Sequence, residues 1–234
     1  MIHVPKYPLT LLVRPALILW IGWVLCACNP GTQSTGFVNP DPNLYDTSWL
    51  TAKLCAAPCW NGLEPGITTR ADSIDSAKKL PFIISDSVFL NKAYGVDIAS
   101  FMCKEPPDFG CVSLLFDQGV LESVSITPGY EITFSQAVEH LGAPDGFLVQ
   151  PVYPDARGCR LQIVWKKRGL ILANTEGVVG LFDFRDDLCT QVSNNHDKLP
   201  PLLLIESVTI TDSVGLKSML ENDTLETWQG FAQN

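Results

Sequence analysis

Six of the eight cysteines carry the clearest covalent chemistry of this 234-residue chain. An even number of thiols in a chain that leaves the cytoplasm predicts disulfide bonds. Nearness in sequence favours three local pairs, while other connectivities stay open. The favoured pairs are Cys55–Cys59, Cys103–Cys111 and Cys159–Cys189. Each bridge would stabilise the fold by about 2–4 kcal/mol.

The Cys55-x-x-x-Cys59 pair could instead bind copper or exchange electrons. A copper carrier of this kind needs a companion histidine, and redox pairs usually enclose two residues rather than three. Beyond Cys28, the only histidines are His140 and His196, which lie far apart in sequence. We therefore expect a structural disulfide here, and no metal or cofactor.

No other group of residues has the spacing of a catalytic site. The sequence contains no Gly-x-Ser-x-Gly motif and no glycine-rich phosphate loop. Four carboxylates near a predicted strand end lack EF-hand spacing, so we expect them to be solvated. They are Glu176, Asp183, Asp186 and Asp187. We expect no catalytic residue and no enzymatic activity.

The first 27 residues have the parts of an export signal. Lys6 and Arg14 supply positive charge, and residues 16–25 form an apolar run that is too short for an ordinary membrane-spanning helix. Small residues follow at the expected cleavage site. We therefore expect residues 1–27 to be a signal peptide that is removed.

The end of this signal resembles the lipobox of diacylglyceryl-modified bacterial lipoproteins. Leu25 and Ala27 occupy the third and first positions before the acceptor Cys28, whereas Cys26 departs from the usual small or hydroxyl residue. The resemblance implies that Cys28 carries diacylglyceryl and palmitate chains. These chains would anchor the protein to the extracytoplasmic face of the cell membrane.

The charge balance excludes one class of partner. Loss of the signal removes two cations and no acid, which takes the formal net charge from −9 to −11. Nucleic-acid binding requires a basic face, so we expect none. Electrostatic adhesion to anionic lipid is equally unfavourable, so the acyl chains must supply the membrane attachment.

The remaining chain predicts a tether and two similar units. Residues 28–48 are rich in Gly, Pro, Asn, Ser and Thr, which is typical of a flexible tether. Residues 49–127 and 128–234 each contain a Pro-Gly pair followed by a threonine that can cap a helix. Thr69 has Asp72 three residues on, and Thr133 has Gln136, as in a capping box.

Each predicted helix is followed by a Gly-Cys pair that opens a β-hairpin. Alternating apolar residues and a polar turn with glycine predict hairpins at 110–127 and 158–173. Further strands are predicted at 178–184 and 207–211, and a helix at 215–231. The expected fold class is α+β: two tandem units, each a helix packed on a small antiparallel sheet, stabilised by disulfides.

Two families share these motifs. The Pro-Gly, Thr, helix and Leu141-Gly142-Ala143-Pro144 pattern resembles the SmpA/OmlA-type outer-membrane assembly lipoproteins, and the tandem units with cysteine-linked strands resemble the β-lactamase-inhibitor-protein fold. The segment from Cys55 to Gly66 (CAAPCWNGLEPG) also resembles uncharacterised lipoproteins of environmental bacteria. The resemblance implies a non-enzymatic protein that binds other proteins.

Aromatic residues on loops are the expected contact residues, because aromatics favour the centres of interfaces. We select Trp60, Tyr130 and Tyr153, the last in the proline-stiffened loop 149–158. The expected function is a lipid-anchored binding or assembly lipoprotein with an unknown protein partner. The alternative is an extracytoplasmic small-ligand carrier or hydrolase whose site the spacing does not reveal.

We predict that native protein begins at an acylated Cys28 and contains no free thiol. Intact-mass analysis with and without alkylation of thiols measures both properties. A chain that retains Met1, or six cysteines that react with the alkylating reagent, would contradict the prediction.

Overall fold

The computed structural model describes residues 40–52, 55–93, 95–105, 109–151, 159–176, 203–221 and 224–231. All of them belong to one compact unit, residues 39–234. The expected signal peptide, Cys28, Tyr153, Cys189, His196 and the strand at 178–184 lie outside the described residues.

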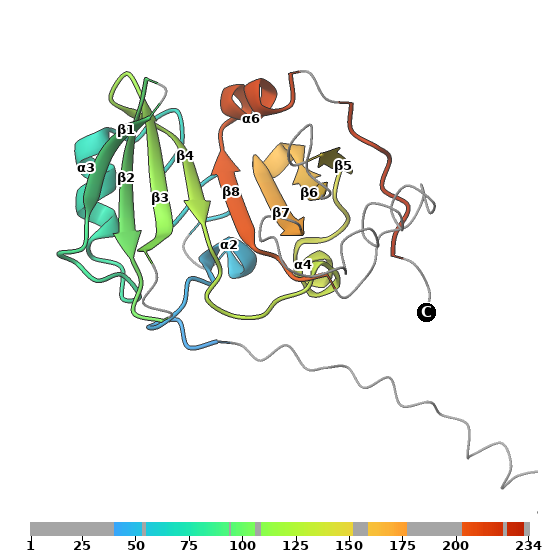
Figure 1. Cartoon of the computed structure of the whole chain (residues 1–234), viewed down its shortest axis with the longest axis horizontal. Coiled ribbons are helices and arrows are strands. Elements are labelled where there is room, and N and C mark those ends of the chain that lie inside the picture. The colour runs from blue at the N-terminus through green and yellow to red at the C-terminus, as the bar shows by residue number, and fades with distance from the viewer. Residues whose placement is uncertain are drawn as a thin grey trace, which may run out of the picture. The chain divides into compact units, whose positions relative to one another are not determined.

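Eight antiparallel strands form a single sheet in the order β1-β2-β3-β4-β8-β7-β6-β5 (Figure 1). The first four strands form one meander, and the next three form a second. The last strand, β8, lies between the two runs and pairs with both β4 and β7. The strands are β1 Phe89–Ala93, β2 Val96–Met102, β3 Phe109–Asp117, β4 Val120–Ile126, β5 Gly146–Pro151, β6 Cys159–Trp165, β7 Leu170–Glu176 and β8 Ser207–Thr211.

The helices are short, and the three longest begin at side-chain caps. In α3 (Arg70–Ala77), Thr69 Oγ1 accepts the backbone N–H of Asp72. In α4 (Phe134–Leu141), Thr133 and Gln136 form the reciprocal capping box. The remaining helices are α2 Ser48–Thr51, the 3₁₀ turn η1 Lys166–Arg168 and α6 Ser213–Met219, which Asp212 caps. Both caps predicted from the sequence are confirmed.

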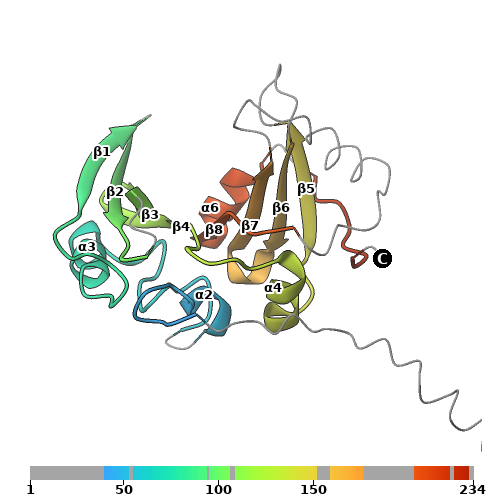
Figure 2. The ribbon, with the colours of Figure 1, turned by 60° about the horizontal axis from the view of Figure 1, so that its bottom comes forward.

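One face of the sheet carries the main core. Strand register places a continuous row of apolar side chains on it across six strands, and every one of them is buried. The row consists of Leu114, Val124, Ile210, Leu170 and Trp165 with neighbours Leu172, Ile163 and Phe147. Figure 2 places α2, α3 and α4 along one side of this sheet. Burial of these side chains supplies the main driving force for the fold.

Within the part of the chain that the structure describes, a helix covers the opposite face only over its second half. There α6 packs Leu216 against Val164 and Ile171, which alternate with the core row, and Leu220 and Leu225 pack beside them. Both faces of β6 and β7 are therefore buried. By contrast, no helix covers the same face of β2 and β3 within the described residues.

The structure confirms the α+β class, the hairpins β3–β4 and β6–β7, and the strand at 207–211. It corrects four expectations. The separate small sheets expected for two units are one eight-stranded sheet. Strands β1, β2 and β5 were not predicted. β1 is an exposed edge strand and β5 has neighbouring residues buried on both faces, so neither alternates, and burial in β2 alternates only from Ala99 onwards. The C-terminal helix ends at Met219 rather than running to 231. The tether ends before residue 48, because Asp46 and Thr47 are buried.

Substitution of the turn glycines Gly169 and Gly119 tests whether close packing of β8 against a turn contributes to stability. Both have positive φ, at 53° and 84°, so alanine at either position costs about 1–2 kcal/mol of conformational energy. A Cβ on Gly169 would also collide with the backbone carbonyl oxygen of Thr211, whereas one on Gly119 meets nothing within 4 Å. We predict that Gly169→Ala destabilises the protein clearly more than Gly119→Ala in urea unfolding. Equal midpoints would show that β8 can move away without cost.

Candidate functional site

A row of hydroxyl side chains crosses the uncovered half of the sheet. Register aligns Ser100, Ser113, Ser125 and Thr209 on β2, β3, β4 and β8. All four are partly exposed, and the Oγ atoms of Ser100 and Ser113 lie 2.9 Å apart in a hydrogen bond. Because side chains alternate across a strand, this row lies on the face opposite the main core.

Apolar side chains flank the hydroxyl row. Ile98 pairs with Leu115 beside it, and both are partly exposed. Phe89 lies at the β1 end of the row, opposite Ser100, and is 44 % exposed. We call Ile98, Leu115, Phe89 and the four hydroxyl residues the open face. None of these side chains carries a charge, so the open face suits contacts with a neutral polar or apolar surface rather than acid–base chemistry.

A cavity of about 410 Å³ lies where α6 meets the start of β4 and the β3–β4 turn. Three carboxylates line it, those of Asp117, Glu122 and Asp212. Asp212 is engaged in the fold, because its Oδ1 accepts the N–H of Gly215 at 2.7 Å. The carboxylates of Asp117 and Glu122 have no hydrogen-bond or ion-pair partner among the described residues.

A second polar cluster surrounds the buried carboxylate of Asp46, which is 6 % exposed. Its oxygens accept Trp60 Nε1 at 2.6 Å and the N–H of Ser48 at 2.9 Å, and its backbone carbonyl accepts the Tyr130 hydroxyl at 3.1 Å. The cluster thus ties residues 40–52 to two distant loops. Asn61 lies close to the carboxylate, but its Nδ2 does not reach hydrogen-bond geometry.

Burial raises the pKa of Asp46, although its hydrogen bonds with Trp60 and Ser48 act in the opposite direction. Burial also raises the pKa of Tyr130, and the neighbouring Asp46 charge adds to that effect. A small cavity of about 170 Å³ adjoins this cluster, with Asp46, Ser48 and apolar Phe82 among its lining residues. These contacts hold one segment onto the body of the fold, which is a structural role.

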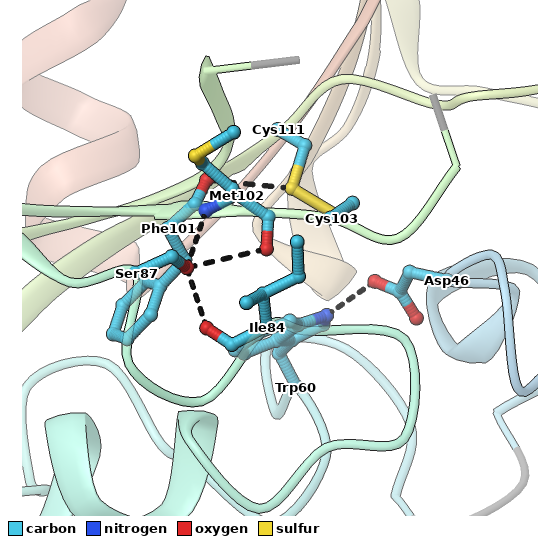
Figure 3. The surroundings of a disulfide bond; sticks show 8 residues. All are labelled: Asp46, Trp60, Ile84, Ser87, Phe101, Met102, Cys103 and Cys111. Atoms are coloured by element: carbon cyan, nitrogen blue, oxygen red, sulfur yellow. Dashed lines mark hydrogen bonds between the residues drawn. A yellow bond between two sulfur atoms is a disulfide. The ribbon is translucent and has the colours of Figure 1, made fainter. Parts of the chain in front are cut away.

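Two of the three predicted disulfides are confirmed. Cys55–Cys59 closes the loop before Trp60, and Cys103–Cys111 joins β3 to the residue that follows β2. Figure 3 places the second disulfide beside Ser87, whose Oγ accepts the N–H of Met102 at 2.9 Å. The side chain of Cys159 is not described, and Cys189 lies outside the described residues, so the third pair stays a prediction.

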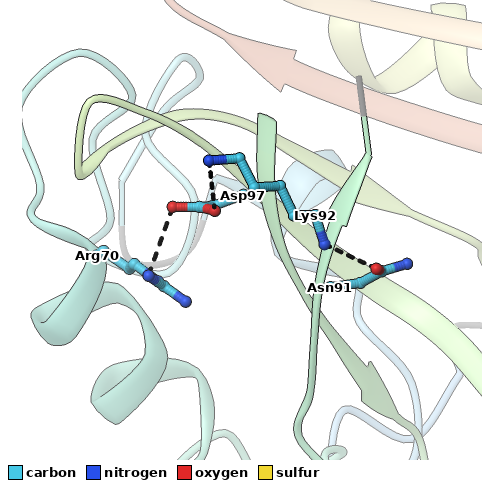
Figure 4. Close-up of polar contacts among 4 residues, drawn as sticks. All are labelled: Arg70, Asn91, Lys92 and Asp97. Carbon is cyan, nitrogen blue, oxygen red and sulfur yellow. Dashed lines mark hydrogen bonds and ion pairs between the residues drawn. The ribbon is translucent and has the colours of Figure 1, made fainter. Parts of the chain in front are cut away.

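Ion pairs within the described residues gather at β1 and β2. Asp97 lies 3.5 Å from Arg70 and 3.9 Å from Lys92, and Asn91 Oδ1 accepts the N–H of Lys92 (Figure 4). The Arg70 guanidinium also lies 6.0 Å from the ring centre of Phe116. These side chains are about one-third to two-thirds exposed, so such pairs contribute little stability. The Arg70–Asp97 pair links α3 to β2, and the Lys92–Asp97 pair links β1 to β2.

The aromatic residues selected from the sequence do not gather at one surface. Trp60 is 1 % exposed and bound to Asp46, which corrects the expectation that it contacts a partner. Tyr130 is partly buried with its hydroxyl on the same cluster, and its ring packs edge-on against Tyr45. His140 lies in the last turn of α4, as expected. The open face was missed because serine and threonine in strands carry no recognised motif.

No helix of the described residues is long and apolar enough to cross a membrane. The same residues contain no group of three or more His, Cys, Asp or Glu side chains placed to hold a metal ion. Comparison with known proteins gives no assignment: no family model, no curated protein and no solved structure matches the chain.

The buried Asp46 carboxylate predicts a pH dependence of stability. Because its pKa is higher in the folded protein than the ordinary value of 3.8, folding favours the protonated form. The contribution of Asp46 to stability therefore increases as the pH falls from its folded pKa towards 3.8, and the charged carboxylate opposes folding above that window. We predict that the wild type gains stability relative to Asp46→Asn as the pH falls from neutral through that window.

Urea unfolding at several pH values measures the difference between the two proteins. Asp75→Asn, at an exposed position of α3, is the matched control and should follow the wild type. If the wild type instead loses stability relative to Asp46→Asn on acidification, the hydrogen bonds to the charged carboxylate outweigh the cost of its burial.

Proposed function

We propose that this chain is an exported, lipid-anchored, non-enzymatic lipoprotein that binds a protein partner through the open face. The observation that carries the proposal is the uncovered, uncharged half of the sheet, with its hydroxyl row and its exposed Phe89. A face of this kind can pair its hydroxyls with a partner without the large desolvation cost of burying charge.

The order of elements supports an origin in two tandem units. A threonine-capped helix precedes four strands twice, as α3 with β1–β4 and as α4 with β5–β8. The last strand of each set lies at the centre of the sheet, where β4 pairs with β8. The likeness to SmpA/OmlA-type lipoproteins and to the β-lactamase-inhibitor-protein fold rests on the sequence motifs and on this order.

The proposed anchor is the acylated Cys28, which would hold the protein at the extracytoplasmic face of the membrane. The lipobox-like residues 25–28 and the disulfides Cys55–Cys59 and Cys103–Cys111 support an oxidising location outside the cytoplasm. The packed segment 40–52 would then join the anchor to the body of the fold, where Asp46 contacts the loops that carry Trp60 and Tyr130.

A small-ligand carrier or hydrolase is the second candidate, and one observation favours it. The cavity beside α6, at about 410 Å³, falls within the range of about 300–1,000 Å³ that is typical of small-molecule sites. However, the groups with shifted pKa values are Asp46, Tyr130 and Arg160, and none of them lines that cavity. A catalytic site usually brings several groups with shifted pKa values together in one pocket. This cavity contains none of them, so we favour a binding protein over a carrier or hydrolase.

Site-specific photo-cross-linking in living cells tests the proposal. A photoreactive residue in place of Ser113, on the open face, should yield a discrete protein adduct of the full-length lipoprotein. The same residue in place of Asp75, an exposed position of α3, should not. Recovery of a bound metabolite without any adduct from Ser113 would favour the carrier instead.

A further inference from the structure

The cavity beside α6 has a geometry that adds to the proposed function. The loop before α3 reaches it because the N–H of Gly66 donates to the carbonyl of Leu121 at 2.7 Å. Gly66 has a φ of 80°, and a Cβ there would lie 2.6 Å from Asp212 Oδ2. The atoms that a Cβ would meet belong to the Asp212 side chain, so a larger residue at position 66 would displace a carboxylate of the cavity, and the positive φ also favours glycine.

One strongly exposed apolar side chain lines this cavity, and a second belongs to the residue that follows a lining residue in sequence. Val214, which lines it, is 72 % exposed, and Ile67, next to the lining residue Gly66, is 71 % exposed. These are the highest exposures of any large hydrophobic side chain among the described residues. Their exposure to water is unfavourable, and the cost disappears when an apolar surface covers them.

The charge of the cavity is of one sign. Asp117, Glu122 and Asp212 contribute carboxylates, and no lysine or arginine is among the lining residues. Like charges near one another repel, and a cation placed between them would relieve that repulsion. A partner group that is apolar along its length and positive at its tip would complement both properties. Arginine and lysine side chains have this form, because their aliphatic stems carry a terminal charge.

The geometry points to a docking site for a basic segment of a protein partner, whose arginine or lysine enters the cavity while neighbouring aliphatic residues cover Ile67 and Val214. The inference rests on the proposed function, because the segment belongs to the partner that meets the open face. The cavity adjoins that face, because α6, which contributes Val214 and Gly215 to its lining, packs on the same side of the sheet as Thr209.

Other occupants fit less well. Ca²⁺ needs several oxygen ligands at about 2.3–2.6 Å, whereas these carboxylates line a cavity of about 410 Å³ and form no metal-binding group. A nucleic acid would be repelled by the same charges. A small polyamine would neutralise the carboxylates but leave Ile67 and Val214 exposed. The peptide alone uses both the charge and the apolar residues.

Fluorescence anisotropy of a labelled peptide tests the inference on the full-length chain in detergent micelles. The probe is a short synthetic peptide in which arginine alternates with valine. Two matched peptides replace every arginine with glutamine or every valine with serine. We expect the probe to bind, both substitutions to weaken binding, and added salt to weaken it further because exposed ion pairs are screened.

Substitutions in the protein locate the site. Asp117→Asn combined with Glu122→Gln should weaken peptide binding by about tenfold, as expected for the loss of two partly exposed ion pairs. Val214→Lys should weaken it as well, by placing a cation of the chain itself at the cavity. Asp75→Asn, which removes an exposed acid elsewhere, should leave affinity unchanged. Far-ultraviolet circular dichroism checks that each variant is folded.

Several outcomes would overturn the inference: no binding of the probe, equal binding of the glutamine or serine peptide, or unchanged binding by Asp117→Asn/Glu122→Gln. Competition by spermidine or Ca²⁺ at the same concentration as the peptide would assign the cavity to a small cation instead. Cross-linking from Ser113 separates the two proposals. If the double variant still yields the wild-type adduct, the docking site is wrong and the binding function stands; if no adduct forms in any protein, both fail.

Discussion

The pairing of β8 with β4 on one side and with β7 on the other makes two runs of strands into one sheet. Thr211 strengthens this junction, because its hydroxyl donates to the carbonyl of Glu122 at 3.0 Å and its N–H donates to Gly169 at 2.9 Å. Without β8, β4 and β7 would each present an unpaired edge, and the core row from Leu114 to Phe147 would be divided in two. The core, the open face and the cavity wall all depend on this strand.

The position of α6, directly after β8, explains why only half of the face opposite the main core is covered by a helix. Asp212 caps α6 directly at the strand end, so the helix can only turn back over neighbouring strands. Leu216 faces Val164 and Ile171, which are apolar on that face, whereas the corresponding positions of β2 and β3 are Ser100 and Ser113. The helix therefore buries the half that carries apolar residues. Sequence polarity on this face decides which half stays open.

Local signals were predictable from the sequence, and long-range ones were not. Thr69 and Thr133 predict the starts of their helices, because a helix cap involves only residues up to three positions away in sequence. The Cys103–Cys111 pair follows from proximity in the same way. By contrast, the bond between Asp46 and Trp60 spans 14 residues, and the Tyr130 contact spans 84, so no spacing rule selects them. The position of β8 between β4 and β7 is a topological choice that the individual strand patterns do not encode.

Under the proposed binding function, the placement of charge would give the open face and the cavity different parts in recognition. Charged groups act over about a Debye length of 8 Å at physiological salt and mainly govern approach and orientation, whereas uncharged surfaces stabilise the complex after contact. Asp117, Glu122 and Asp212 lie at one end of a face that has no charge of its own. A partner with one basic segment would therefore be oriented before its neutral surface reaches Ser113 and Ser125. If the carboxylates were instead spread along the strands, the net charge would be the same but would not orient the partner. Each carboxylate would also have to lose its hydration when the partner made contact.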